Sequence, residues 1–220
     1  MRRVVVFGTG GFAREVHQVI KDINRHVPTW EMLGFVDDNP AAHGTELHGL
    51  PVLGGREWAG SHREVAVAIA IGSPASRKRV AQALRAEGCT SFATLVHPAA
   101  WVGDNVTIEE GSIVCAGCLI TTDLTIGRHV ILNLGCTLGH DTLLADFVTA
   151  SPSVNVSGCC RIGEGVDVGT GAKIIQGITL GEWSVVGAGA VVVRDLPPNI
   201  TAVGSPARPI RSRPEGWHEN

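Results

Sequence analysis

A spacing of six residues runs through the C-terminal half of this chain. Counting in sixes from Val96 to Val186 gives sixteen positions, of which fifteen are Val, Ile or Leu. Four residues after many of these aliphatics stands a small or medium apolar residue such as Cys118, Cys136 or Cys160. A helix repeats every 3.6 residues and a strand every two, so neither element alone explains a period of six.

Hexapeptide repeats of this kind predict a parallel β-helix. Each hexad supplies a short strand and a turn, and three hexads close one triangular coil, so residues 18 apart in the sequence lie in register. The aliphatic residues fill the interior and the small residues pack beside them. The repeat therefore explains Cys118, Cys136 and Cys160 as inward-facing core residues. It also explains the CxxC spacing of Cys115 and Cys118 without a metal.

Residues 1–95 show a different pattern. RRVVVFGTGGFAREVHQVI (residues 2–20) predicts a strand, a Gly-rich turn and a helix. Further strands are expected at 32–38, ending in Asp37 and Asp38, and at 65–72, where VAVAIAIG is apolar throughout. Residues 73–88 predict a helix with Ser73 as N-cap, Pro74 at its first position and Gly88 at its end. We therefore expect a small Rossmann-like α/β domain over 1–95, a β-helix over 96–194 and a C-terminal tail over 195–220.

Composition excludes several classes of protein. The formal net charge is −3, so no strongly basic surface is available for nucleic acid. No apolar run approaches the roughly 18 residues that span a bilayer. The N-terminus predicts a first strand and no signal peptide. We therefore expect a cytoplasmic protein without nucleic-acid or membrane partners, whose six cysteines are reduced thiols.

The segments GTGGFAREV (8–16) and GFVDDN (34–39), followed by the hexads, give the chain a recognisable resemblance. It resembles the left-handed β-helix hexapeptide-repeat acyltransferases, in particular the sialic acid O-acetyltransferases and nucleotide-amino-sugar N-acetyltransferases. The resemblance covers nearly the whole chain. It implies left-handed winding, acetyl-CoA as co-substrate, no metal, and a homotrimer with active sites between subunits. It also implies that a nucleotide sugar contacts Gly8, Gly10, Gly11 and Asp37, with Phe12 standing where many relatives have His.

Two other interpretations of the Gly-rich turn remain open. Gly8, Gly10 and Ala13 match the G-x-G-x-x-A fingerprint of NAD-binding domains. However, the acidic residue after the second strand lies further along than the usual distance of about 20 residues, and the domain is about half the size of a full dinucleotide fold. Alternatively, the glycines serve only a tight turn.

His140 and Asp141 are the candidate reacting residues. His140 is third in its hexad, a turn position that points outward. Acyl transfer from a thioester needs a base, and imidazole suits this task near neutral pH. A neighbouring carboxylate such as Asp141 can hold the imidazole in the required tautomer. In the family that the chain resembles, a His followed by an acid occupies this hexad, and the His is the general base.

Gly158 lies 18 residues after His140, so we expect the two to lie side by side. Its backbone N–H would then bind the thioester carbonyl as it becomes an oxyanion. In the family that the chain resembles, a glycine at this place has this role. The resemblance also places the basic tail, including Arg208, near the coenzyme, and we expect Gly171 and Ala188 to line the pantetheine arm. The inward position of Cys136 argues against an acyl-cysteine, so we expect direct attack.

Three functions are consistent with these features. The first is acetyl-CoA-dependent acetylation of the amino group of a nucleotide-linked sugar. The second is O-acetylation of sialic acid or another glycan hydroxyl. The third is a non-catalytic scaffold that binds a nucleotide sugar. A zinc hydratase on the same fold is disfavoured because no two of His97, His129 and His140 are 18 or 36 residues apart.

Overall fold

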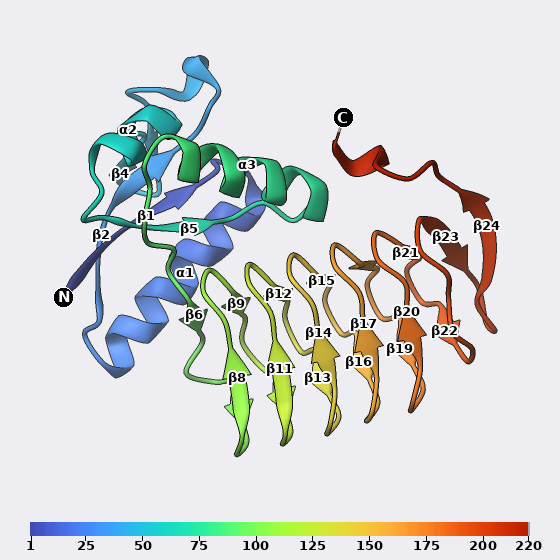
Figure 1. Cartoon of the computed structure of the whole chain (residues 1–220). Coiled ribbons are helices and arrows are strands. Elements are labelled where there is room, and N and C mark those ends of the chain that lie inside the picture. Colours follow the sequence, from blue (N-terminus) through green and yellow to red (C-terminus); the bar gives the residue numbers. More distant parts are fainter. Residues whose placement is uncertain (220) are drawn as a thin grey trace. The chain divides into compact units, whose positions relative to one another are not determined.

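A computed structural model describes residues 1–219, so only the last residue of the expected tail lies outside it. The chain forms two compact units (Figure 1). The first comprises Met1–Gly72 and Ser76–Pro98, and the second comprises the rest of the described chain. In residues 1–219 no helix is both long and apolar enough to cross a membrane.

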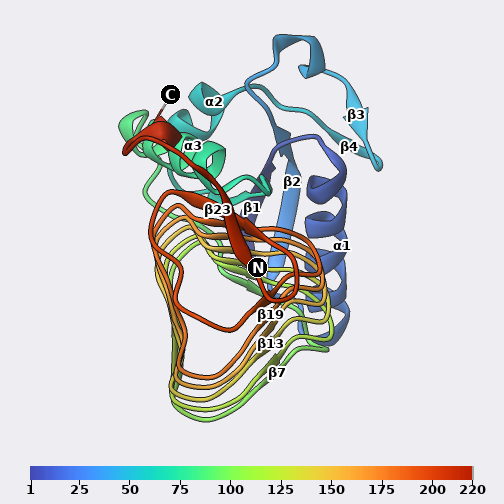
Figure 2. The same cartoon turned by 90° about the vertical axis from the view of Figure 1, so that its right-hand side faces the viewer.

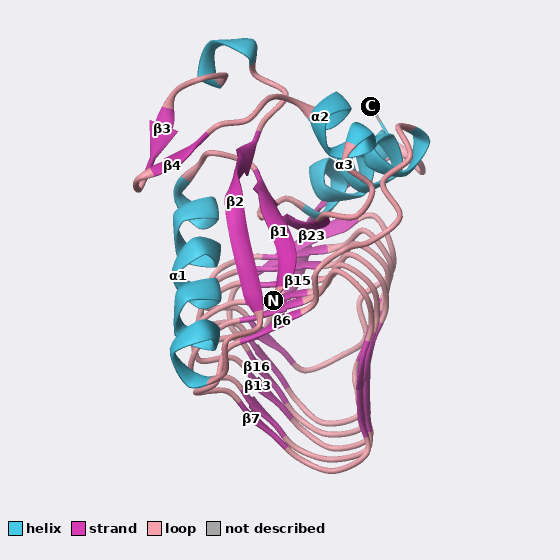
Figure 3. Cartoon of the chain, turned by 90° about the vertical axis from the view of Figure 1, so that its left-hand side faces the viewer, coloured by secondary structure: helices cyan, strands magenta, loops and turns pink. Residues whose placement is uncertain are grey.

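The first unit is built on a parallel sheet with the strand order β2-β1-β5. Figure 3 shows α1 on one side of this sheet and α3 on the other. Every residue of β5 is buried, as expected of a strand covered on both faces. Three strands with flanking helices confirm the expected small α/β domain. The elements are β1 (Arg2–Phe7), α1 (Gly11–His26), β2 (Trp30–Val36), η1 (Pro40–Ala42), β3 (Glu46–Leu47), β4 (Leu50–Pro51), α2 (Arg56–Ser61), β5 (Ala66–Ile69), α3 (Pro74–Ala86) and β6 (Leu95–Val96).

The second unit is a parallel β-helix with the left-handed winding that the resemblance implied. Seen end on, its coils superpose as a triangle (Figure 2). Face 1 contains β7 (Trp101–Val102), β10 (Leu119–Ile120), β13 (Thr137–Leu138), β16 (Asn155–Val156), β19 (Lys173–Ile174) and β22 (Val191–Val192). Face 2 contains β8 (Val106–Ile108), β11 (Leu124–Ile126), β14 (Leu143–Leu144), β17 (Arg161–Ile162) and β20 (Thr179–Leu180). Face 3 contains β9 (Ile113–Val114), β12 (Ile131–Leu132), β15 (Thr149–Ala150), β18 (Asp167–Val168), β21 (Val185–Val186), β23 (Ile200–Val203) and β24 (Arg208–Ser212). The 3-10 helix η2 (Trp217–Glu219) follows.

The register between coils is 18 residues, as the hexads predict: Leu138 pairs with Val156, and Val156 with Ile174. From Val114 to Val186 every sixth residue is at most 5% exposed. Burying each such aliphatic side chain contributes about 1.5–3 kcal/mol. The predicted burial is less accurate in the first coil, where Val102 is 37% exposed.

The structure confirms that the cysteines at the small-residue position of the hexad are core residues. Cys118, Cys136 and Cys160 are fully buried, and all six cysteines are free. Each of these three thiols donates to a turn carbonyl one coil further on, such as Cys136 Sγ to Ser151 O at 3.2 Å. A hydrogen bond with Cys118 and then burial raise the pKa of the Cys136 thiol, so it stays protonated. Cys136 therefore belongs to the core.

Candidate active site

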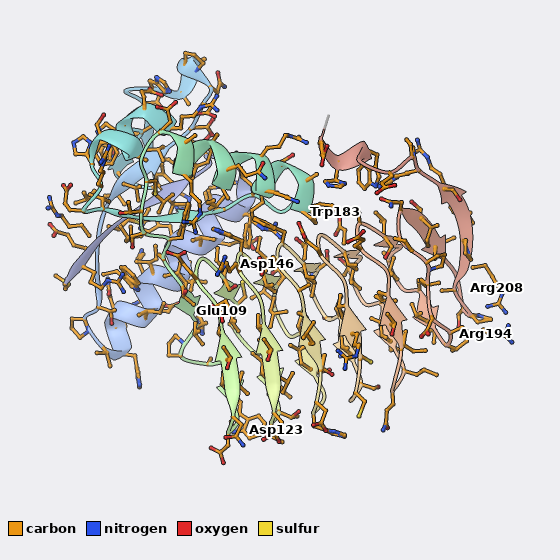
Figure 4. The ribbon with its side chains drawn as sticks, in the orientation of Figure 1. Glu109, Asp123, Asp146, Trp183, Arg194 and Arg208 are labelled. Carbon is orange, nitrogen blue, oxygen red and sulfur yellow. The ribbon has the colours of Figure 1, made fainter. Side chains whose placement is uncertain are left out.

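The turns between face 1 and face 2 form one edge of the prism, here called the catalytic edge. The second residue after each face 1 strand lies at the same place in its turn. From β10 to β19 these residues are Thr122, His140, Gly158 and Gln176. In the last coil the turn is two residues shorter, and Arg194 is the second residue after β22. Figure 4 labels two residues of this edge: Asp123 at the lower side of the solenoid, and Arg194 at the C-terminal end. The 18-residue register therefore aligns His140 with Gly158, as the sequence predicted.

His140 and Asp141 form a pair within one turn. His140 Nδ1 lies 2.8 Å from Asp141 Oδ2, and both side chains are more than half exposed. Asp141 adopts a left-handed φ of 57°, and its N–H donates to Thr122 O one coil earlier. When Nδ1 carries the proton and donates it to the carboxylate, Nε2 keeps its lone pair. In that tautomer the pair leaves Nε2 able to accept a proton.

Gly158 lies against the imidazole. A Cβ atom on Gly158 would lie 2.7 Å from His140 Nε2 and 2.8 Å from Cε1, closer than real Cβ atoms approach. Gly158 is buried, and its N–H donates no hydrogen bond within the described residues. Buried N–H groups are usually paired, so an unpaired one is available to a ligand. The edge thus presents a basic nitrogen and an amide donor next to each other.

Cys159 is a neighbour of the pair on this edge that the sequence analysis did not select. It lies 18 residues after Asp141, and its N–H donates to His140 O at 2.7 Å. It is the exposed member of the six cysteines. Ligand atoms of His140, Asp141 and Cys159 all lie within 4.8 Å of one another. The same step of 18 that singled out Gly158 would have found Cys159.

The residues expected to hold the coenzyme occupy other places. Gly171 and Ala188 lie in turns between face 3 and face 1, at the opposite end of the face 1 strands from Gly158. Arg208 begins β24, is exposed and donates to Ala207 O at 3.0 Å. Figure 4 draws Arg194 and Arg208 at the C-terminal end of the solenoid. Arg194, which the sequence analysis did not select, is an exposed cationic residue in a turn of the same edge as His140.

In the first unit the structure brings the Gly-rich turn and Asp37 together. Asp37 Oδ2 accepts a hydrogen bond from Thr9 Oγ1 at 2.7 Å, and Oδ1 accepts one from Asn39 N at 2.9 Å. Gly8 has φ +112°, and a Cβ there would lie 3.3 Å from Ala70 O, so the turn needs glycine at this place. Thr9 had not been selected from the sequence, because its role depends on this contact.

Gly10 and Gly11 are the exposed part of the same turn. Gly10 is the N-cap of α1 and Gly11 its first residue. A Cβ on Gly10 would meet nothing within 4 Å. The first N–H groups of a helix have no acceptor within the helix, and they favour anions. The exposed start of α1 therefore leaves its first N–H groups open to solvent.

Known proteins resemble both units. Residues 3–84 match the family described as the PglD N-terminal domain. A GDP-perosamine N-acetyltransferase from Escherichia coli O157:H7 is 30% identical over 217 residues, covering 95% of this chain and 96% of that protein. Galactoside O-acetyltransferase from Escherichia coli K12 is 31% identical over 132 residues, which cover 63% of its length.

Solved structures of acetyltransferases also resemble this chain over nearly its whole length. Histidine-substituted variants of perosamine N-acetyltransferase from Caulobacter crescentus, in complex with CoA and GDP-perosamine, superpose with a TM-score of 0.87 at 32% identity. The likeness covers 95% of this chain and 97% of theirs. The acetyltransferase domain of PglB from Neisseria gonorrhoeae FA1090, in complex with acetyl coenzyme A, has a TM-score of 0.84 and 31% identity, covering 95% and 99%.

Proposed function

Because this chain belongs to the hexapeptide-repeat acetyltransferases that include GDP-perosamine N-acetyltransferase, we propose that it acetylates the amino group of a nucleotide-linked amino sugar. Acetyl-CoA is the proposed acetyl donor. The observation that carries the proposal is the catalytic edge, where His140 is held by Asp141 and packs against Gly158, whose N–H has no partner within the described residues. A base beside an amide donor is what direct acyl transfer from a thioester requires.

In the proposed reaction the sugar amine attacks the thioester carbonyl. His140 Nε2 takes a proton from the attacking nitrogen as the N–C bond forms. The carbonyl oxygen gains negative charge, and the Gly158 N–H donates to it, which contributes a few kcal/mol to transition-state stabilisation. The C–S bond then breaks, and the imidazolium returns the proton to the CoA thiolate. Asp141 stabilises the imidazolium and keeps Nδ1 protonated.

The catalytic edge also suggests where the anionic coenzyme lies. Arg194 is exposed two coils beyond Gly158 on the same edge, so we assign it to the phosphates of CoA. Arg208 would add a second cation at that end of the solenoid. Gly171 and Ala188, at the other end of face 1, remain our candidates for the far end of the pantetheine path. In a chain of net charge −3, such local cations are needed to attract CoA.

The first unit is the proposed nucleotide-sugar site. Phosphates would bind the start of α1 at Gly10 and Gly11, where unpaired N–H groups favour anions. Asp37, oriented by Thr9, would accept hydrogen bonds from the nucleoside. Gly8 would allow the backbone to approach the ligand. The NAD interpretation is weaker, because the sheet has the three strands of a half-size nucleotide fold.

We also propose that the protein forms a homotrimer in the cytoplasm. Single chains leave Trp101 and Leu119 on face 1, Leu143 on face 2 and Ile175 on the catalytic edge 39–57% exposed. A trimer would cover such side chains by packing flat solenoid faces together. The free thiols support a reducing compartment. Light scattering of the purified protein tests the trimer directly.

The decisive test is a substrate panel with acetyl-CoA. We expect release of CoA thiol with UDP-, GDP- or dTDP-linked amino sugars, and none with the matching hydroxyl sugars. Turnover on free sialic acid or on hydroxyl sugars would instead favour the O-acetyltransferase, which the likeness to galactoside O-acetyltransferase suggests. Binding of a nucleotide sugar without any turnover would favour the scaffold.

A further inference from the structure

Cys159 lies next to the proposed base but has no part in the mechanism. It is the third residue of the turn after β16, one coil after Asp141. Its side chain is exposed, whereas the other five cysteines of the chain are buried. Within the described residues its thiol makes no hydrogen bond, in contrast to the thiols of Cys118, Cys136 and Cys160. Packing in the core therefore does not explain why a cysteine stands at this place.

The turn does not explain it either. Cys159 has a left-handed φ of 58°. At the same place in neighbouring turns stand Asp123, Asp141 and Gly177, the residue types that tolerate this conformation. A cysteine at this place is less favourable for the backbone than any of them. What cysteine brings to this place in the turn is an exposed thiol on the catalytic edge.

The neighbours of this thiol are good metal ligands. One ligand atom each from His140, Asp141 and Cys159 lies within 4.8 Å of the other two. The hydrogen bond from Cys159 N to His140 O, at 2.7 Å, ties the two turns together. The separation of the ligands is thus set by the backbone of adjacent coils, and small rotations of exposed side chains suffice to close them around an ion.

We propose that His140, Asp141 and Cys159 bind Zn²⁺ and that the bound metal inhibits acetyl transfer. One thiolate, one imidazole and one carboxylate form a donor set that suits zinc, with a fourth tetrahedral position left for water. Binding through Nδ1 breaks the hydrogen bond to Asp141, and binding through Nε2 takes the lone pair that accepts the proton. Either mode removes the base. The inhibition rests on the proposed function, but the metal site itself does not.

Calorimetric titration of the reduced, full-length protein with Zn²⁺ alone tests the site. We expect one ion per chain, and affinity at least about tenfold weaker in Cys159→Ser, because even the loss of a supporting partner costs a metal site about that much. Serine is tolerated in such a turn, since Ser153 has φ 60° at the equivalent place of another edge. Asp123→Asn, one coil before Asp141, is the matched control and should bind Zn²⁺ as the wild type does.

Co²⁺ provides a second readout that does not depend on activity. The wild type should show a thiolate-to-cobalt charge-transfer band, and Cys159→Ser should lack it. Absence of Zn²⁺ binding to the wild type, or an equal affinity and band in Cys159→Ser, would overturn the site.

Inhibition is measured separately. Cys159→Ser should transfer acetyl groups as the wild type does without metal and should need at least about tenfold more Zn²⁺ for half-inhibition. Equal inhibition of both proteins would overturn the inhibitory role. If neither protein transfers acetyl groups in any substrate combination, the proposed function fails, and the calorimetric result still decides the metal site.

Discussion

Replacing Gly158 with alanine places a methyl group against the imidazole of His140. The added Cβ would lie 2.7 Å from Nε2. Non-bonded heavy atoms sit about 3.5–4.0 Å apart at their optimum, so the ring must retreat by about 1 Å. The ring can do this because the His140 side chain is 52% exposed. The substitution therefore moves the proposed base without crowding the core.

The consequence for activity follows from this displacement. A misplacement of about 1 Å in a reacting group costs about 10²-fold in rate. The free energy of unfolding should change little, by about 0.5 kcal/mol or less, because Gly158 has no left-handed φ that a methyl group would strain. We therefore expect kcat to fall about 10²-fold, while the melting temperature stays close to that of the wild type.

The assay follows CoA thiol release with a chromogenic disulfide reagent, using the amino sugar that the substrate panel identifies. Ser157→Ala changes the exposed neighbour in the same turn and is the matched control. A wild-type kcat in Gly158→Ala would refute the geometry of base and amide donor. A large drop in melting temperature would show that the substitution damages the fold.

Three further substitutions test the other assigned residues. His140→Ala should lower kcat by about 10²–10⁴-fold and leave CoA affinity nearly unchanged, and wild-type turnover would remove the base assignment. Asp37→Ala should raise KM for the nucleotide sugar. Asp38→Ala is the control and should not raise it, because the Asp38 carboxylate pairs with an arginine side chain. An unchanged KM in Asp37→Ala would place recognition elsewhere. Arg194→Ala should raise KM for acetyl-CoA, and the effect should shrink as salt screens the charge. Arg161→Ala, an exposed arginine on face 2, is its control, and equal effects in both would argue against a specific phosphate contact.

Much of the second unit could be predicted from the spacing of residues. The six-residue period predicted the coil, the core and the 18-residue register, because inward and outward positions alternate by count along such a chain. His140 could be assigned to the surface for the same reason. The last coil departs from this count: Val185 pairs with Thr201, 16 residues on, because the turn between face 1 and face 2 is two residues shorter there.

The amino-acid sequence alone determined which residues share an edge of the prism, and so which residues could meet. Only the tertiary structure decided how they meet. In it Asp141 accepts from His140 Nδ1, the Gly158 N–H has no acceptor among residues 1–219, and the Cys159 thiol is exposed beside them. The tertiary structure also joined Thr9 to Asp37 across 28 residues, a contact that no local pattern encodes. The physical reason is that periodicity fixes position along the backbone, whereas contacts between side chains depend on turn dihedrals and rotamers that form only when the coils stack.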